Sequence, residues 1–290
     1  MKFLALFICW IPFFTSAQDM SRHYKIYSTN TKSAITLDKV VNDLTTVDVI
    51  FFGEEHNDST AHYLELALLK KMIEKYPGKT ALSMEMFETD CQTVLNEYLG
   101  GMIREKNFLT DARVWHNYKD YRPLIETAKA NNLPVVAANA PGRYVSMVNK
   151  MGLPSLNNLS AIAKTYLPPL PIDTATGAYY QKFLSTMGGH GAMMGMELFQ
   201  AQNLWDATMG WSIATFYATH KGFKVLQING GFHSEQKLGA AAQLIKYSPG
   251  IKIANIAVYT DGDFNNPDWV KYLPDADYII IADPKLPKTF

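Results

Sequence analysis

The chain has 290 residues, of which 48% are hydrophobic, and its 27 lysines and arginines balance 27 aspartates and glutamates. A chain of this length and apolar content can bury a large core, which excludes a disordered protein. Its net charge of zero provides no overall field for phosphate groups. The composition therefore argues against nucleic-acid partners and against binding to membrane surfaces by bulk charge.

The first 17 residues have the pattern of a secretory signal peptide. Lys2 provides a positive start, residues 3–14 are apolar, and residues 15–17 (Thr-Ser-Ala) offer a small-residue cleavage site. Cys9 lies inside the apolar run and lacks the polar linker that follows a lipidated N-terminus. We therefore expect an exported protein of the periplasm or cell envelope, without a lipid anchor, whose mature part is a single domain over residues 18–290.

Short apolar runs alternate with longer amphipathic stretches along most of the chain, which predicts βα units. Helical spacing of apolar residues predicts helices over residues 59–75 and about 194–220. The pattern indicates an α/β fold with an open, mostly parallel sheet flanked by helices. The predicted strands are, in chain order, residues 47–52, 80–84, 134–138, 224–228, 251–259 and 278–281.

Residues 143–187 break this rhythm. Four prolines interrupt the segment and no strand pattern occurs in it. Insertions of this length in α/β domains usually lie over the strand ends. We interpret the segment as a mostly helical, lid-like insertion.

Polar residues follow four of the predicted strands. Because the carboxyl ends of parallel strands face one crevice, these residues should meet there, where such folds bind ligands. Gly53 and Gly230 each stand three residues before a histidine, and this double Gly-x-x-His is the strongest single signal. The four clusters are Gly53-Glu54-Glu55-His56, Glu85 with Glu88, Asn139, and Gly230-Gly231-Phe232-His233.

Imidazole and carboxylate groups together suit a transition metal, and they equally suit acid–base chemistry on a bound water. For a metal site we expect His56, Glu85 and His233 as ligands. For a hydrolase we expect Glu54 or Glu55 as the general base. Supporting polar side chains are expected from Asn139, Gln202 and Asp206, the last two standing one helical turn apart.

Two further clusters offer apolar or aromatic surface. Residues 188–196 are rich in glycine and methionine and contain His190, Met193 and Met194. Methionines at this density can hold a flat hydrophobic ligand, although filling gaps in a core is their commoner role. Tyr118 and Tyr121 belong to an aromatic cluster that is mostly expected in the core, but a phenolate is also an available ligand of ferric haem.

Several of these motifs resemble, in the same order, those of the ChaN family of iron-regulated haem-binding proteins. That family lies in a superfamily with the Tiki and TraB proteins and, more distantly, the erythromycin esterases. The resemblance implies an α/β fold with a helical lid, export, haem bound at an apolar surface between the subunits of a homodimer, and outer-membrane haem-uptake machinery as a partner. The segments that carry it are residues 53–58, 84–87, 136–141, 201–209 and 230–233.

Two functions follow, and we rank them. The first is an exported haem-binding protein in haem and iron acquisition, without enzymatic activity. The second is a metal-dependent hydrolase, a peptidase or esterase, which uses the double Gly-x-x-His and a glutamate, as the resemblance to the Tiki proteins implies. A third reading is that the polar crevice is kept from an enzymatic ancestor and only organises the loops.

Overall fold

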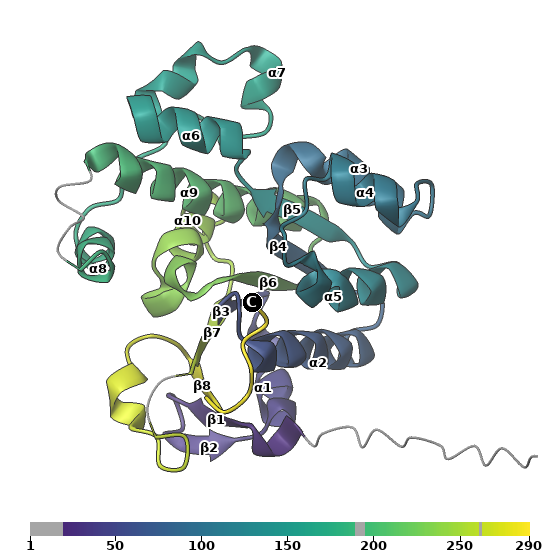
Figure 1. Ribbon diagram of the computed structural model, residues 1–290, viewed down its shortest axis with the longest axis vertical. Coiled ribbons are helices and arrows are strands. Elements are labelled where there is room, and N and C mark those ends of the chain that lie inside the picture. Colours follow the sequence, from purple (N-terminus) through teal and green to yellow (C-terminus); the bar gives the residue numbers. More distant parts are fainter. Residues whose placement is uncertain (1–19, 189–194, 261–262) are drawn as a thin grey trace, which may run out of the picture.

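The computed structural model describes residues 20–188, 195–260 and 263–290 (Figure 1). The predicted signal peptide, residues 1–17, lies outside these ranges. So do His190, Met193 and Met194, three of the candidate haem-binding residues. In the described part of the chain, helices cover both faces of a central sheet.

The described strands form one sheet. They are β1 (Tyr24–Ser28), β2 (Ser33–Ile35), β3 (Val49–Glu54), β4 (Thr80–Glu88), β5 (Val135–Asn139), β6 (Lys224–Gly230), β7 (Ile253–Tyr259) and β8 (Tyr278–Ala282). Their order across the sheet is β2-β1-β8-β7-β3-β6-β4-β5. The pairs of β1 with β2 and with β8 are antiparallel, and all other neighbours are parallel. The predicted α/β class with a mostly parallel sheet is confirmed.

The α-helices lie between and around these strands. They are α1 (Leu37–Asp43), α2 (Ser59–Lys75), α3 (Gln92–Leu99), α4 (Glu105–Asp111), α5 (Tyr118–Ala130), α6 (Gly142–Met151), α7 (Ala161–Lys164), α8 (Ala178–Thr186), α9 (Met196–Thr219) and α10 (Gly239–Tyr247). Helices α2 and α5 pack on one face of the sheet, and α9 and α10 pack on the other. None of the helices in the described ranges combines the length and hydropathy needed to span a membrane.

The central strand β3 shows how the sequence builds both cores. Its residues are all buried, and alternate side chains point to opposite faces of the sheet. Ile50 and Phe52 belong to the core under α2 and α5, whereas Val49 and Phe51 belong to the core under α9 and α10. Glu54 follows the same alternation, so its carboxylate enters the side of the sheet that faces α2 and α5.

The six predicted strands are all present, but the sequence did not reveal β1 and β2. These strands are short and form the antiparallel edge of the sheet, where no βα rhythm marks them. Within residues 143–187, which are all described, the structure has most of α6, all of α7 and α8, and no strand. Helix α8 from this segment packs beside the start of α9.

Candidate functional site

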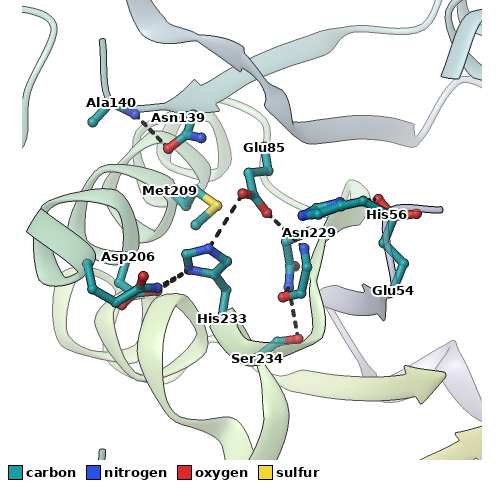
Figure 2. A network of polar contacts seen from close by, with 12 residues as sticks. Glu54, His56, Glu85, Asn139, Ala140, Asp206, Met209, Asn229, His233 and Ser234 are labelled. Atoms are coloured by element: carbon teal, nitrogen blue, oxygen red, sulfur yellow. Dashed lines mark hydrogen bonds and ion pairs between the residues drawn. The ribbon is translucent and has the colours of Figure 1, made fainter. Parts of the chain in front are cut away.

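Three adjacent strands bring the predicted site residues to one edge of the sheet. Strands β3, β6 and β4 are parallel neighbours, so their carboxyl ends meet. Glu54 ends β3 and Gly230 ends β6, while Glu85 lies in a longer β4 than the sequence predicts. The register of β4 against β5 shifts between Met84 and Glu88, a bulge of the kind that re-aims side chains. His56, Glu85 and His233 thereby gather at the same edge of the sheet, and we refer to the region around these three side chains as the crevice (Figure 2).

His233 lies between two carboxylates. Its Nδ1 is 2.7 Å from Oδ1 of Asp206, and its Nε2 is 3.5 Å from Oε1 of Glu85 (Figure 2). Nε2 of Gln202 also lies 3.0 Å from Nδ1 of His233, so both supporting residues predicted on α9 reach this imidazole. From α8, the hydroxyl of Tyr179 donates to Asp206, a contact that could not be predicted because the two residues lie on separate helices.

These contacts fix the charges in this half of the crevice. Burial alone would lower the pKa of His233, but the carboxylates of Glu85 and Asp206 raise it to about 10. Burial alone would raise the pKa of Glu85, but His233 and His56 lower it to about 2, and the amide of Gly230, which donates to Oε2 at 2.8 Å, adds to this. At neutral pH the crevice therefore holds a buried imidazolium between carboxylates.

His56 makes the corresponding contact on the other side of Glu85. Its Nδ1 lies 2.9 Å from Oε1 of Glu54, and the hydroxyl of Tyr121 donates to the same oxygen at 2.7 Å. Its Nε2 lies over the backbone of Gly230, where an added Cβ atom would stand 2.9 Å away. The side chain of His56 is 36% exposed, against 10% for His233. His56 is therefore the more accessible imidazole of the two.

The environment of Glu54 explains how it holds His56. Burial raises the pKa of Glu54 to about 8, and the charge of Glu65 adds to the rise, while the contacts with His56 and His62 oppose it. The contact with Glu54 occupies Nδ1 of His56, so Nε2 is the ring nitrogen left for a ligand. Glu54 orients the imidazole from below and does not face the crevice.

Two residues of this network were missed by the sequence reasoning. His62 and Glu65 lie on α2, where Nδ1 of His62 is 3.3 Å from Oε2 of Glu54 and 3.4 Å from Oε2 of Glu65. A signal was present, because Glu65 falls in the apolar stripe of the helix beside Leu64 and Leu68. A carboxylate at such a position needs a polar partner in the core.

Glu55 and Asn139 do not face the central crevice residues. The carboxylate of Glu55 accepts from Nζ of Lys288 at 2.7 Å and from the hydroxyl of Thr260 at 2.8 Å, and its side chain is 43% exposed. Asn139 accepts the amide hydrogen of Ala140 at 2.9 Å and so holds the chain at the end of β5. These contacts give Asn139 a structural role and leave Glu55 paired with the C-terminal segment.

The two tyrosines proposed as haem ligands are buried in the core on α5. The side chain of Tyr121 is fully buried and its hydroxyl is bonded to Glu54. The hydroxyl of Tyr118 is also buried, within the described residues without a hydrogen-bond partner. Burial raises the pKa of both phenols above its ordinary value. This placement does not favour either phenolate as a ligand of haem iron bound at the surface.

The two imidazoles of the crevice can serve as metal ligands. His56 and His233 each carry a carboxylate on Nδ1 and direct Nε2 toward the region around Glu85, an arrangement that suits an iron or zinc ligand once the ring of His233 has given up its second proton to make room for the ion. Within the described ranges, however, the group of ligand atoms that all lie within 4.8 Å of one another is a different one, Glu54, His62 and Glu65. The crevice residues are therefore close neighbours without forming a closed three-ligand set.

Comparisons with known proteins agree with the fold and the motifs. Residues 40–244 match the family described as haem-binding uptake, Tiki superfamily, ChaN. The solved structure of ChaN of Campylobacter jejuni, described as binding haem cofacially, has 17% identity and a TM-score of 0.67, with 90% of this chain and 97% of that chain covered. No curated protein matches the sequence significantly.

Two more distant structural matches are weaker. A Bacillus cereus protein has 14% identity and a TM-score of 0.44, covering 82% of this chain and 72% of its own. An erythromycin esterase has 8% identity and a TM-score of 0.46, covering 89% and 82%. Neither of these carries an argument about function. The family match spans more than half of the sequence, and it confirms the resemblance that the motifs indicate: the chain belongs to the ChaN family of haem-binding uptake proteins in the Tiki superfamily.

Proposed function

We propose that this chain binds haem after export to the periplasm or cell envelope and that it serves haem or iron acquisition. The observation that carries the proposal is the family match over residues 40–244. The structural likeness to the Campylobacter protein, over 90% of this chain, is consistent with it. The fold alone does not specify the ligand, so the choice of haem ligand depends on which donor side chains are accessible.

Among the described residues of the crevice, His56 fits an axial ligand of haem iron best. Its Nδ1 is held by Glu54, its Nε2 is the nitrogen left for a metal, and its side chain is partly exposed. The ring of Trp115 stands edge-on to the imidazole at 5.1 Å between centroids, which adds aromatic surface beside it. If haem binds here, Nε2 of His56 would be a ligand of its iron atom.

The remaining haem candidates stay part of the proposal on sequence grounds. His190 is a second source of an axial ligand, and Met193 and Met194 a source of apolar surface. Tyr118 and Tyr121 are removed from the ligand set, since both hydroxyls are buried.

We propose a homodimer that receives haem through outer-membrane uptake machinery. Export predicts that the mature protein recovered from the cell envelope begins after Ala17, which mass spectrometry of the intact chain tests.

Titration of the purified mature chain with haemin tests haem binding directly. The Soret band should shift and increase until the protein is saturated, and sedimentation should report whether haem changes the subunit number. A spectrum that remains the sum of free haemin and protein at every ratio would end the proposal.

A second candidate function is metal-dependent hydrolysis at the crevice. Two carboxylate–imidazole pairs favour it, Glu54 with His56 and Asp206 with His233, because proteins orient zinc-binding imidazoles in this way. His56, Glu85 and His233 would hold the ion, and the ion would lower the pKa of a bound water to about 7.

Assays of ester and peptide hydrolysis with added Zn²⁺ test this second function. Turnover should disappear in His233→Ala and persist in Glu55→Gln, because Glu55 is paired with Lys288 outside the crevice. A wild-type chain without turnover on the whole panel, with Zn²⁺, Mn²⁺ or Fe²⁺ supplied, would end it.

A further inference from the structure

A second polar cluster lies beneath the crevice, between β3 and α2. It consists of Glu54, His62 and Glu65, and we refer to it as the buried cluster. Each of these side chains offers one ligand atom, and the three atoms all lie within 4.8 Å of one another. The two carboxylates are fully buried, while the side chain of His62 keeps 8% exposure. The cluster is therefore at the margin of the core.

Two carboxylate oxygens of the buried cluster lack partners. Among the described residues, neither Oε2 of Glu54 nor Oε1 of Glu65 accepts a hydrogen bond from a protein donor, and both atoms are buried, although the two carboxyl groups face each other and Nδ1 of His62 lies 3.3 Å from Oε2 of Glu54. A buried polar atom without a partner costs about 1–3 kcal/mol, and more when it carries charge. Two such atoms in one cluster require either a proton shared by the two carboxyl groups or a bound cation.

The hydrogen bonding of His62 makes its Nδ1 a third acceptor that points into the same space. Its Nε2 lies 3.2 Å from the carbonyl oxygen of His56, which can only accept a hydrogen bond. In the neutral ring Nε2 therefore carries the hydrogen, and Nδ1 presents its lone pair toward Glu54 and Glu65. A backbone carbonyl that fixes the far nitrogen is the usual second contact of a metal-binding histidine.

The spacing of the ligand atoms matches a tetrahedral ion. Nδ1 of His62 is 3.3 Å from Oε2 of Glu54 and 3.4 Å from Oε2 of Glu65. In a tetrahedral zinc site with metal–ligand distances of about 2.0–2.1 Å, neighbouring ligand atoms stand about 3.3–3.4 Å apart. The two separations from Nδ1 of His62 thus already equal those of a zinc site, and the third lies within 4.8 Å.

We propose that Glu54, His62 and Glu65 bind one divalent cation of the zinc class. Two carboxylates would neutralise its charge, which makes its burial favourable. Oε1 of Glu54 would remain bonded to Tyr121 and His56, so the ion would fix the residue that orients His56. This site is separate from the crevice set of His56, Glu85 and His233, and it does not depend on haem binding.

Zinc content of matched variants tests the buried site. The purified full chain is stripped with chelator, dialysed against ZnCl₂, freed of excess ion and analysed for bound zinc. Glu65→Gln removes one ligand charge with little change of shape, and Glu85→Gln is the control that alters only the crevice. We expect Glu65→Gln to bind one zinc ion fewer per chain than the wild type, and Glu85→Gln to retain at least one.

The proposal is overturned if Glu65→Gln and the wild type bind the same amount of zinc, including the case in which neither binds any. It is also overturned if Glu85→Gln binds no zinc. A proton shared by the two carboxyl groups is the competing occupant, and it predicts the first of these outcomes. If Glu65→Gln does not fold, Co²⁺ loaded into the wild type and Glu85→Gln decides the question. Both should show the intense visible bands of tetrahedral cobalt, and their absence from Glu85→Gln overturns the site.

Discussion

Nδ1 of His56 lies 2.9 Å from the buried carboxylate of Glu54, and this contact determines which nitrogen of the imidazole is available. Asp206 stands in the same relation to His233 at 2.7 Å. The two histidines of the double Gly-x-x-His are thus oriented by carboxylates from different elements, one from β3 and one from α9. Of the two imidazoles, only the one held by Glu54 is substantially exposed, so His56 is the ligand that we propose.

The variant Tyr121→Phe should show whether Tyr121 is a haem ligand or a residue that positions Glu54. The hydroxyl of Tyr121 donates to Glu54 in the core, and its loss should cost roughly 1–3 kcal/mol of unfolding free energy. The Soret titration should still saturate. Urea unfolding and haemin titration measure the two effects, and a variant that folds normally but binds no haem would contradict the positioning role.

Gly230→Ala should displace His56. An added Cβ atom would stand 2.9 Å from Nε2 of His56, which forces the ring to move. We expect haem affinity to fall by about tenfold, as for other changes in the orientation of a metal ligand. Gly231→Ala is the matched control, since its Cβ atom meets the flexible end of Glu235 instead. Equal haem affinity in the two variants would argue against His56 as the ligand.

Asp206→Asn should destabilise the fold strongly. Asp206 and His233 form a buried pair, and removing one charge leaves the imidazolium without its nearest partner. The expected loss of unfolding free energy is roughly 3–5 kcal/mol. Asp173→Asn is the control, because Asp173 pairs with Lys246 in solvent and should change stability by at most about 0.5 kcal/mol. Losses of similar size in both variants would contradict this account of the pair.

Asp90, which is not one of the crevice residues, should make the free energy of unfolding depend on pH. Burial alone would raise the pKa of Asp90, but the guanidinium groups of Arg143 and Arg113 lower it below its ordinary value. A pKa that is lower in the folded state contributes stability above the unfolded value of about 4, and this is lost as pH falls through the folded pKa. Asp90→Asn should therefore be less stable than the wild type at pH 7. Denaturant unfolding should show the difference shrinking below about pH 4, and a constant difference would contradict the linkage.

Much of the fold could be predicted because local patterns determine it. Each strand from β3 to β8 contains a short, mostly apolar run, and the glycines before His56 and His233 mark the turns at two strand ends. Parallel pairing then brings those ends together, whatever the separation in sequence.

The finer contacts could not be predicted, because they depend on three-dimensional packing. Glu54 and Glu55 are adjacent in sequence, yet one enters the core beside Tyr121 and the other pairs with Lys288. Strand alternation predicts that they point to opposite sides. It does not identify a partner that lies 233 residues away in the chain. The same limit hid the role of His62, whose partners outside its own helix come from a strand and a loop.

Haemin titration of His56→Ala tests the central claim most directly. His116→Ala is the matched control, because His116 is exposed and lies next to Trp115 in the same loop. We predict that the wild type and His116→Ala give the same saturable Soret shift, while in His56→Ala the band moves to another position and the affinity falls by at least about tenfold. A His56→Ala spectrum and affinity indistinguishable from those of the wild type would contradict the assignment.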